Sequence, residues 1–468
     1  IRALQDIELV IGIPFYNETQ TLLEMLEIIN TQLADYLTDK KTIFICSGDP
    51  AGSETLEILL KTELHIPLVG FTMKPGINGR GSSIRAIMEL SRRLEANLII
   101  LAADLPSMGQ RGFQANWVKG LIESIQGPYD LTVGIFERHH SEDVIAALLV
   151  APILEVFYNY HFKDPLSGIY AVSHDLLEEL CLEIKFATDI IRGYGIEPWL
   201  LTRAIMWKKN ICQLKLGSKL NPPSIEKLNY LFKDLAASIF ACIENDHHYW
   251  SQHPAISISP DILGDGFADE PCPAIYTLDN VLRSFKRNAL QYRDLYEKIL
   301  PTHISQMLID IISQTDGQYT LDSLKHYDNN TWAFIVYEAL LCYHFNHQIP
   351  RDDLLNALTY AFNGRLAAIM HSIEQLAGSE AEMAPAVAQY IRSKQRETFL
   401  TQFPSLKANW LSKSKEAKPA LTPTHFLEFI PGLPIVLPKK ITGRGGKTVW
   451  TEGVFNQLHH RYRSAFNH

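Results

Sequence analysis

Two observations predict an α/β fold followed by a mostly helical C-terminal part. Up to about residue 220, short apolar runs alternate with segments whose leucines and isoleucines recur at helical spacing. From 281 to about 409 the periodicity is almost wholly helical. Alternating strands and helices are typical of a mostly parallel sheet covered on both faces. We therefore expect an α/β domain at 1–222, a helix and linker at 223–280, and a helical domain with a basic tail at 281–468.

The expected strands are apolar and β-branched, and the expected helices carry an apolar residue at every third or fourth position. Strands are expected at 7–14, 42–47, 67–73, 97–103, 130–136, 169–172 and 211–216. Helices are expected at 19–36, 53–61, 82–94, 112–126, 144–160, 197–208 and 224–244. Ser53 is a residue type that caps helices. The segment at 245–280 is rich in Asp, His, Pro and Gly, which indicates a linker or long loop.

The composition excludes several classes of protein. The 468 residues are 46% apolar and 20% charged, which is ordinary for a soluble globular chain of two or three domains. The formal net charge of -9 argues against a nucleic-acid partner. The longest apolar stretch, at 144–154, is shorter than the roughly 20 residues of a membrane span, so we expect no transmembrane segment. Six scattered cysteines without a Cys-x-x-Cys motif fit reduced thiols in a cytoplasmic protein.

Several motifs fall where expected strands end, which is where open α/β sheets bind ligands. The run Pro-Phe-Tyr-Asn-Glu at 14–18 closes the first strand, and its glutamate either contacts a ligand or caps the next helix. A glycine-flanked Arg80 before a helix suits a phosphate, although alone it is typical of a surface turn. Asp104 ends an apolar strand and is either a ligand of a divalent cation or the cap of the next segment.

Two later motifs lie at 164–168 and 193–197. Glu197 follows a Gly-Tyr-Gly turn and precedes an apolar helix. It is either a carboxylate favoured by the helix dipole or a buried charge that stabilises positive charge in a reacting substrate. The histidine pairs at 139–140, 247–248, 344 and 347, and 459–460 lack a second ligand pair at a recognisable spacing, so we expect solvated or core histidines there.

The order and spacing of these motifs resemble the retaining glycosyltransferases that make glucosyl-3-phosphoglycerate and mannosylglycerate. The resemblance covers about residues 7–222. It rests on matches to the family's motifs at 13–18, 79–81, 102–104, 133–138, 165–171 and 193–197. The last three are the specific ones, because their order and spacing agree together. The resemblance implies a Rossmann-like GT-A domain for a nucleotide sugar, followed by a mostly α-helical C-terminal domain.

The implied activity is transfer of a hexose from UDP-glucose or GDP-mannose to a small polar acceptor such as glycerate or 3-phosphoglycerate, with retention. Asp104 and Glu197 are then the candidate catalytic residues. The candidate donor-binding residues are Pro14, Phe15, Tyr16, Glu18, Ser47, Gly79, Arg80, Gly81 and Asp104. The candidate acceptor-binding residues are Arg138, Leu166, Ser167, Gly168 and Tyr194. The implied cofactor is Mg²⁺ or Mn²⁺, bound weakly and with help from the nucleotide by Asp104 and Asn221.

The sequence departs from the family at the metal and acceptor motifs. Ala102 stands where the family's metal motif begins with aspartate, and Asn221 where it has a histidine. Glu142 and Asp143 fall in the acceptor loop, where two acids would repel an anionic acceptor. These departures keep a second interpretation open, a degenerate GT-A scaffold that binds a nucleotide sugar or a protein partner without catalysis. The helical C-terminal part is also a candidate surface for a homo-oligomer.

Overall fold

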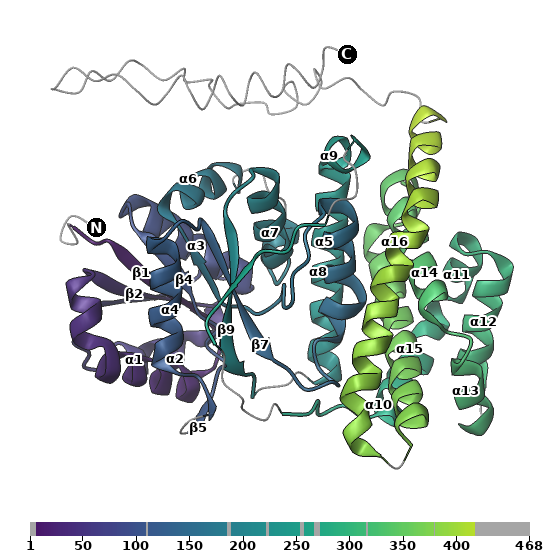
Figure 1. Cartoon of the computed structure of the whole chain (residues 1–468), viewed down its shortest axis with the longest axis horizontal. Helices are drawn as coiled ribbons and strands as arrows, with labels where there is room; N and C mark the ends of the chain where they lie inside the picture. The colour runs from purple at the N-terminus through teal and green to yellow at the C-terminus, as the bar shows by residue number, and fades with distance from the viewer. Residues whose placement is uncertain are drawn as a thin grey trace. The chain divides into compact units, whose positions relative to one another are not determined.

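An eight-stranded sheet lies at the centre of the N-terminal half, in the order β10-β9-β7-β8-β4-β1-β2-β3 (Figure 1). The strands are β1 (Leu9–Phe15), β2 (Thr42–Gly48), β3 (Leu68–Thr72), β4 (Asn97–Ile100), β7 (Leu131–Glu137), β8 (Tyr170–Val172), β9 (Ile211–Ser218) and β10 (Asp261–Leu263). Strand β8 runs antiparallel to both neighbours, and the other pairs are parallel. The predicted α/β class is therefore confirmed. Strands β5 (Ser107–Met108) and β6 (Arg111–Gly112) form a separate hairpin.

The computed structural model describes residues 6–108, 111–184, 189–220, 224–252, 257–265, 272–314, 317–378 and 380–416. The predicted metal ligand Asn221 and the predicted basic tail lie outside these ranges. Residues 1–414 form one compact unit; of the second, 415–468, only Lys415 and Glu416 are described. Within the described ranges no helix has both the length and the apolar character needed to cross a membrane.

The two faces of the sheet bury their side chains in two separate cores. Successive side chains of a strand point to opposite faces, so Val10 and Ile11 of β1 enter different cores. The core around Ile11 is covered by α1 (Thr19–Asp39), α2 (Ser53–Leu59) and α4 (Ala115–Gln126). The core around Val10 is covered by α3 (Arg80–Arg93), α6 (His174–Glu183), α7 (Ile196–Met206) and α8 (Ile225–Asn245). Helices on both faces explain why the strands are continuous apolar runs.

Three elements differ from the sequence-based expectation. Helix α6 was not expected, although Ser173 caps it by accepting a hydrogen bond from the Leu176 amide. The expected helix at 144–160 begins as a π-helical turn at Ala146–Val150 and continues as α5 (Ala151–Tyr158). The segment expected as a linker contributes α9 (His247–Gln252) and β10, which pairs with β9 at the edge of the sheet. A three-residue strand is too short to show a periodicity.

The C-terminal helices are α10 (Leu278–Ala289), α11 (Arg293–Ile299), α12 (Thr302–Ser313), α13 (Gly317–Leu324), α14 (Asn329–Phe345), α15 (Arg351–Ala377) and α16 (Ala384–Glu416). Phe232 of α8 stacks on Phe362 of α15, with ring centroids 4.3 Å apart. Trp332 of α14 donates through Nε1 to the carbonyl of Leu148, 2.8 Å away. The apolar core is therefore continuous from one face of the sheet into the helices. The division of the chain at 222 and 280 stays a prediction.

Candidate active site

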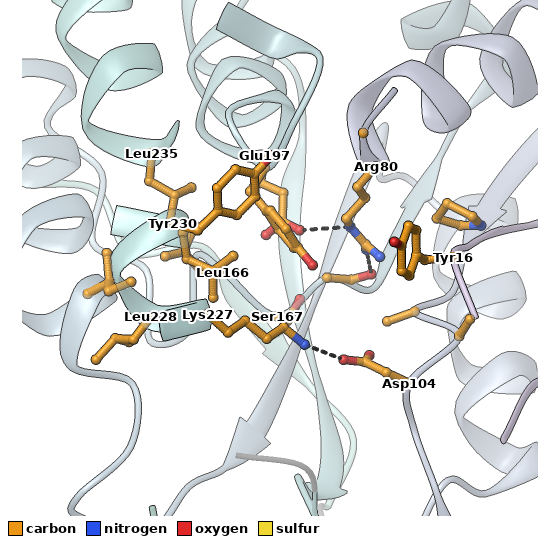
Figure 2. Close-up of a pocket in the computed structure, with 18 of the residues that line it drawn as sticks. Tyr16, Arg80, Asp104, Leu166, Ser167, Glu197, Lys227, Leu228, Tyr230 and Leu235 are labelled. Atoms are coloured by element: carbon orange, nitrogen blue, oxygen red, sulfur yellow. Dashed lines mark hydrogen bonds and ion pairs between the residues drawn. The ribbon is translucent and has the colours of Figure 1, made fainter. Parts of the chain in front are cut away.

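A cavity of about 660 Å³ lies at the carboxyl ends of β1, β4 and β7, beside the first turns of α8 (Figure 2). Parallel strands bring their carboxyl ends to one edge of a sheet, so motifs far apart in sequence meet there. The predicted site residues that line the cavity are Pro14, Phe15, Tyr16, Glu18, Gly79, Arg80, Asp104, Arg138, Leu166, Ser167, Gly168, Tyr194 and Glu197. The predicted donor contacts Ser47 and Gly81 are buried and are not part of its lining.

Arg80 and Glu197 form an ion pair in this cavity (Figure 2). Arg80 begins α3, and its Nε lies 3.4 Å from Oε1 of Glu197. Its Nη2 donates to the carbonyl of Gly168, 2.9 Å away. Tyr170 donates its hydroxyl to Oε2 of Glu197 over 3.1 Å. Burial raises the pKa of Glu197, while Arg80 and the Tyr170 hydrogen bond act in the opposite direction. Glu197 is therefore a buried carboxylate held in one orientation from two sides.

Two glycines let the start of α3 lie against the segment that leads into α7. A Cβ on Gly81 would lie 1.9 Å from the carbonyl oxygen of Ile191, so no side chain fits there. Gly79 has a φ of 96°, and its Cβ would lie 2.6 Å from the carbonyl oxygen of Arg192. Positive φ and close backbone contact both favour glycine. The glycines that flank Arg80 thus bring its guanidinium to Glu197.

The carboxylate of Glu18 is used by its own turn. Its Oε2 accepts hydrogen bonds from the amides of Tyr16 and Asn17, at 2.6 and 3.1 Å. These amides precede α1, and Glu18 makes no side-chain hydrogen bond that caps the helix, so the capping interpretation of its carboxylate is wrong. Tyr16, whose surface is 50% exposed, presents its ring at the mouth of the cavity (Figure 2).

Asp104 is surrounded by cations. Nζ of Lys227, in the first turn of α8, donates to Oδ2 of Asp104 over 3.2 Å (Figure 2). Burial opposes ionisation of Asp104, but Lys219, Lys227 and Arg80 together lower its pKa below the ordinary value. Burial lowers the pKa of Lys219, and repulsion by Arg138 lowers it further. No helix follows Asp104 directly, so it does not cap one.

Two acids, Glu142 and Asp143, line the cavity together with Arg138. Arg138 donates through Nε and Nη2 to the two carboxylate oxygens of Asp164, at 2.8 and 3.0 Å, so its charge is balanced by that carboxylate. Glu142 is only 2% exposed, and neither of its carboxylate oxygens has a hydrogen-bond partner within the described part of the chain. Burial and the nearby Asp164 raise the pKa of Asp143 to about 7, although Arg138 and Arg392 oppose the shift.

The helical part holds the loop that carries these acids. Arg392 of α16 donates through Nη2 to the carbonyl oxygens of His140, 3.0 Å away, and of Glu142. Tyr276 donates its hydroxyl to the carbonyl of Ser141, and Tyr276 also lines the cavity. The amide of Ala274 donates to the Ser141 hydroxyl over 2.9 Å. Residues after the α/β domain therefore shape one wall of the cavity.

The described donor groups do not fit a resident divalent cation. Among the described residues, no group of three or more His, Cys, Asp or Glu side chains is placed to hold a metal ion. Ala102, which lines the cavity, offers only a methyl group at the position of the missing aspartate. Asp104 is already paired with Lys227. Mg²⁺ and Mn²⁺ need several oxygen ligands, and charged oxygens hold them best.

Sequence reasoning missed two important residues of the cavity, Lys219 and Lys227. Lys219 directly follows β9, so the strand-end rule that selected Asp104 would also have found it. Lys227 had no comparable signal, because its approach to Asp104 depends on how α8 packs on the sheet.

The α/β sheet with a charged cavity at its strand ends has the architecture of a ligand-binding α/β protein. No family model matches the sequence, and no curated protein shows significant similarity to it. Solved structures do show similarity, and among them are two hexosyl-3-phosphoglycerate synthases and a mannosyltransferase.

One of these is glucosyl-3-phosphoglycerate synthase of M. tuberculosis, with 20% identity, a TM-score of 0.37, and coverage of 52% of this chain and 83% of that one. Mannosyl-3-phosphoglycerate synthase of Rubrobacter xylanophilus has 12% identity, a TM-score of 0.36, and coverage of 53% and 77%. The mannosyltransferase PcManGT of Pyrobaculum calidifontis, solved with GDP-Man and Mn²⁺, has 13% identity, a TM-score of 0.32, and coverage of 88% of each chain. The group that the sequence motifs resemble is thus also found among the solved structures.

Proposed function

We propose that this chain is a glycosyltransferase that moves a hexose from a nucleotide diphosphate sugar to a small polar acceptor, with retention. The observation that carries the proposal is the meeting of Arg80, Asp104 and Glu197 in one cavity from three separate segments. Cations beside a buried carboxylate suit a substrate that has an anionic leaving group next to a carbon on which positive charge develops. UDP-glucose and GDP-mannose are the donors to test first.

The donor would lie across the carboxyl ends of β1 and β4. Residues 14–16 border this side of the cavity, and the exposed ring of Tyr16 offers a surface for a base. Arg80 would face the diphosphate from the start of α3, where the helix dipole also favours an anion. Ser47 does not line the cavity, so it would not touch the donor directly.

Glu197 would act on the sugar. Its carboxylate is buried and oriented by Arg80 and Tyr170, so it needs no reorganisation when charge develops. A fixed carboxylate near the anomeric carbon stabilises an oxocarbenium-like transition state. As the glycosidic bond to the diphosphate breaks, the leaving oxygen takes the electron pair. The acceptor hydroxyl forms the new bond on the same face, and its proton passes to the leaving diphosphate oxygen.

The acceptor would bind beside Arg138, Leu166 and Gly168, where the cavity meets the loop that carries Glu142 and Asp143. Arg138 also donates to the carbonyl of Leu166 over 3.2 Å, which fixes this wall. Glycerate and 3-phosphoglycerate, the acceptors implied by the resemblance, are the anionic members of the small polar class. The nearby acids disfavour them and favour neutral or amine-bearing acceptors.

The rival function is a scaffold that binds a nucleotide sugar without catalysis. Ala102, in place of a metal-binding aspartate, favours this rival. The predicted Mg²⁺ or Mn²⁺, the cytoplasmic location and assembly through the C-terminal helices all stay predictions.

Release of nucleoside diphosphate from a panel of nucleotide sugars tests the enzyme against the scaffold. We expect saturable release with one donor, and a loss of about 100-fold or more in Glu197→Gln, as for removal of a transition-state contact. Glu183→Gln is the matched control, since Glu183 also pairs with an arginine, Arg203, but lies outside the cavity lining. Donor binding without release in the wild-type protein would favour the scaffold.

A further inference from the structure

We propose that Arg80, Lys219 and Lys227 together replace the resident divalent cation and bind the donor's diphosphate directly. This inference rests on the proposed function and deepens it, because it names the group of the donor that is recognised and the charges that recognise it. All three side chains line the same cavity, and all three interact electrostatically with Asp104 at the end of β4.

The first support is the contact between Lys227 and Asp104. The 3.2 Å hydrogen bond puts an ammonium group against the carboxylate that would otherwise hold a metal ion. The side chains of Lys227 and Asp104 keep 41% and 22% of their surface exposed, so the ion pair faces the cavity rather than the protein core. An ammonium has three donors, and this bond uses one. Asp104 therefore serves to position Lys227 at the cavity.

The second support is the helix that carries Lys227. The hydroxyl of Ser224 accepts a hydrogen bond from the Lys227 amide over 3.3 Å, which caps α8 at this point. Leu228, Leu231 and Leu235 of the same helix also line the cavity. Lys227 is thus presented by a capped and packed helix, which limits the entropy lost when it orders against a ligand.

The third support is Arg80. Its Nε is buried and lacks a hydrogen-bond partner within the described residues, although it lies 3.4 Å from Glu197. The guanidinium also lies over the ring of Tyr194, with 5.9 Å between Cζ and the ring centroid. A planar guanidinium can bind phosphate oxygens through more than one donor, whereas an ammonium acts as a point charge.

The charges of this corner suit a diphosphate. Arg80, Lys219 and Lys227 supply three positive charges, and Asp104 and Glu197 two negative ones. A diphosphate ester brings two negative charges. One is balanced by the net positive charge of these five side chains, and the other has to be stabilised by hydrogen-bond donors of the cavity. A divalent cation would have to compete with Lys227 for Asp104, without the second carboxylate that Ala102 replaces.

Calorimetric titration of the full chain with UDP and with GDP, in EDTA and then in Mn²⁺, tests this inference. We expect one nucleotide to bind in EDTA, with an affinity that Mn²⁺ changes by less than about three-fold. Lys227→Met and Lys219→Met should each weaken binding by about ten-fold or more, as for loss of a charge-assisted hydrogen bond. Lys227→Arg should keep most of the affinity, because it keeps the charge.

Lys233→Met is the matched control, because Lys233 lies on the same helix but pairs with Asp352, 2.6 Å away, outside the cavity lining. Thermal unfolding of each variant verifies that it is folded. Binding that requires Mn²⁺ and disappears in EDTA would overturn the cationic site but leave the proposed function standing. If Lys227→Met and Lys219→Met are both folded and bind the nucleotide as tightly as the wild type, the cationic site is also overturned and the proposed function still stands. If neither nucleotide binds in either condition, the proposed function itself fails.

Discussion

Lys227 of α8 and Asp104, which follows β4, are joined by a 3.2 Å hydrogen bond although they lie 123 positions apart in the sequence. The bond ties the first helix after the α/β domain to the end of a central strand. It also pairs the strand-end carboxylate with an ammonium. This one hydrogen bond therefore fixes α8 against the sheet and also sets the charges at the strand-end carboxylate in the cavity.

Asp104→Ala should lower turnover, because Lys227 loses the group that holds it and the local charge balance changes. We expect a loss of about ten-fold or more in nucleoside diphosphate release, since a hydrogen bond to a charged group is typically worth about 1.5–3 kcal/mol. Asp175→Ala, at an exposed position of α6, is the control. Full turnover in Asp104→Ala would contradict this account of the residue.

Arg392→Met should loosen the loop at 139–143 without affecting donor binding. Arg392 donates to two carbonyl groups of this loop, so its loss leaves those groups unpaired. We expect hydrogen exchange in this loop to accelerate by about ten-fold, which corresponds to about 1.4 kcal/mol of local stability. Arg396→Met is the control one turn along α16, because Arg396 pairs with Glu155 instead. Equal exchange in both variants would argue against the positioning role.

Asp143 should make stability depend on pH. Its pKa rises from 3.8 in the unfolded chain to about 7 in the folded one, chiefly through burial. The folded state therefore holds this proton more tightly, and the resulting stability, present below about pH 4, is lost as pH rises through 7.

Asp143→Asn removes this titration. The unfolding free energy of the variant minus that of the wild type should therefore increase by on the order of 1–3 kcal/mol from pH 4.5 to pH 8. One pKa unit corresponds to about 1.4 kcal/mol, and solvent screening reduces the total. Asn also tolerates the positive φ of 60° at this position. Urea unfolding at the two pH values checks the effect, with Asp175→Asn as an exposed control. A difference between Asp143→Asn and wild type that does not vary with pH would refute it.

The acceptor should be neutral or amine-bearing rather than anionic. Glu142 and Asp143 line the cavity beside Arg138, and the charge of Arg138 is already balanced by Asp164. We expect glycerol or glucosamine to accelerate donor consumption about ten-fold more than 3-phosphoglycerate at equal concentration, since like charges in a cavity cost roughly 1–2 kcal/mol. The double variant with Glu142→Gln and Asp143→Asn should show a smaller preference for glycerol or glucosamine over 3-phosphoglycerate, because it lacks both acids. A preference of the wild type for 3-phosphoglycerate would contradict the assignment.

Truncation after residue 245 should abolish cooperative folding. Phe232 of α8 stacks on Phe362, and the Trp332 indole donates a hydrogen bond to the carbonyl of Leu148. The helical part therefore covers apolar surface within the same chain. Removing it would expose several large side chains, each worth about 1.5–3 kcal/mol when buried. Calorimetry and light scattering on the two chains check this expectation. A truncated chain that unfolds at the same temperature as the full chain would show that the helical part is not needed for packing.

Much of the α/β half could be predicted from local pattern. Buried strands such as β1 and β2 are continuous apolar runs, and the turn before α3 is marked by the glycines that Arg80 needs on either side. Asp104 was selected by its position at the end of an apolar run, Glu197 by the Gly-Tyr-Gly turn before an apolar helix, and the family resemblance implied a role for both. These signals are local, because a strand end and its turn are encoded by neighbouring residues.

What could not be predicted depends on tertiary packing. Nothing in the sequence around Lys227 shows that α8 returns to β4. The hydrogen bonds from Arg392 to the loop at 139–143 join positions about 250 residues apart. Gly81 was expected to touch the donor, but its missing side chain instead lets Ile191 approach. A glycine in the sequence indicates that some group packs closely against the backbone, but it does not indicate whether that group belongs to a ligand or to the protein.

The most direct test of the central claim is a crystal structure of the full chain soaked with UDP-glucose or GDP-mannose. We predict the nucleotide at the ends of β1 and β4, with diphosphate oxygens within hydrogen-bonding distance of Arg80 and Lys227 and the sugar facing Glu197. A nucleotide bound among the C-terminal helices, or a cavity that stays empty at saturating concentrations of both donors, would contradict the account.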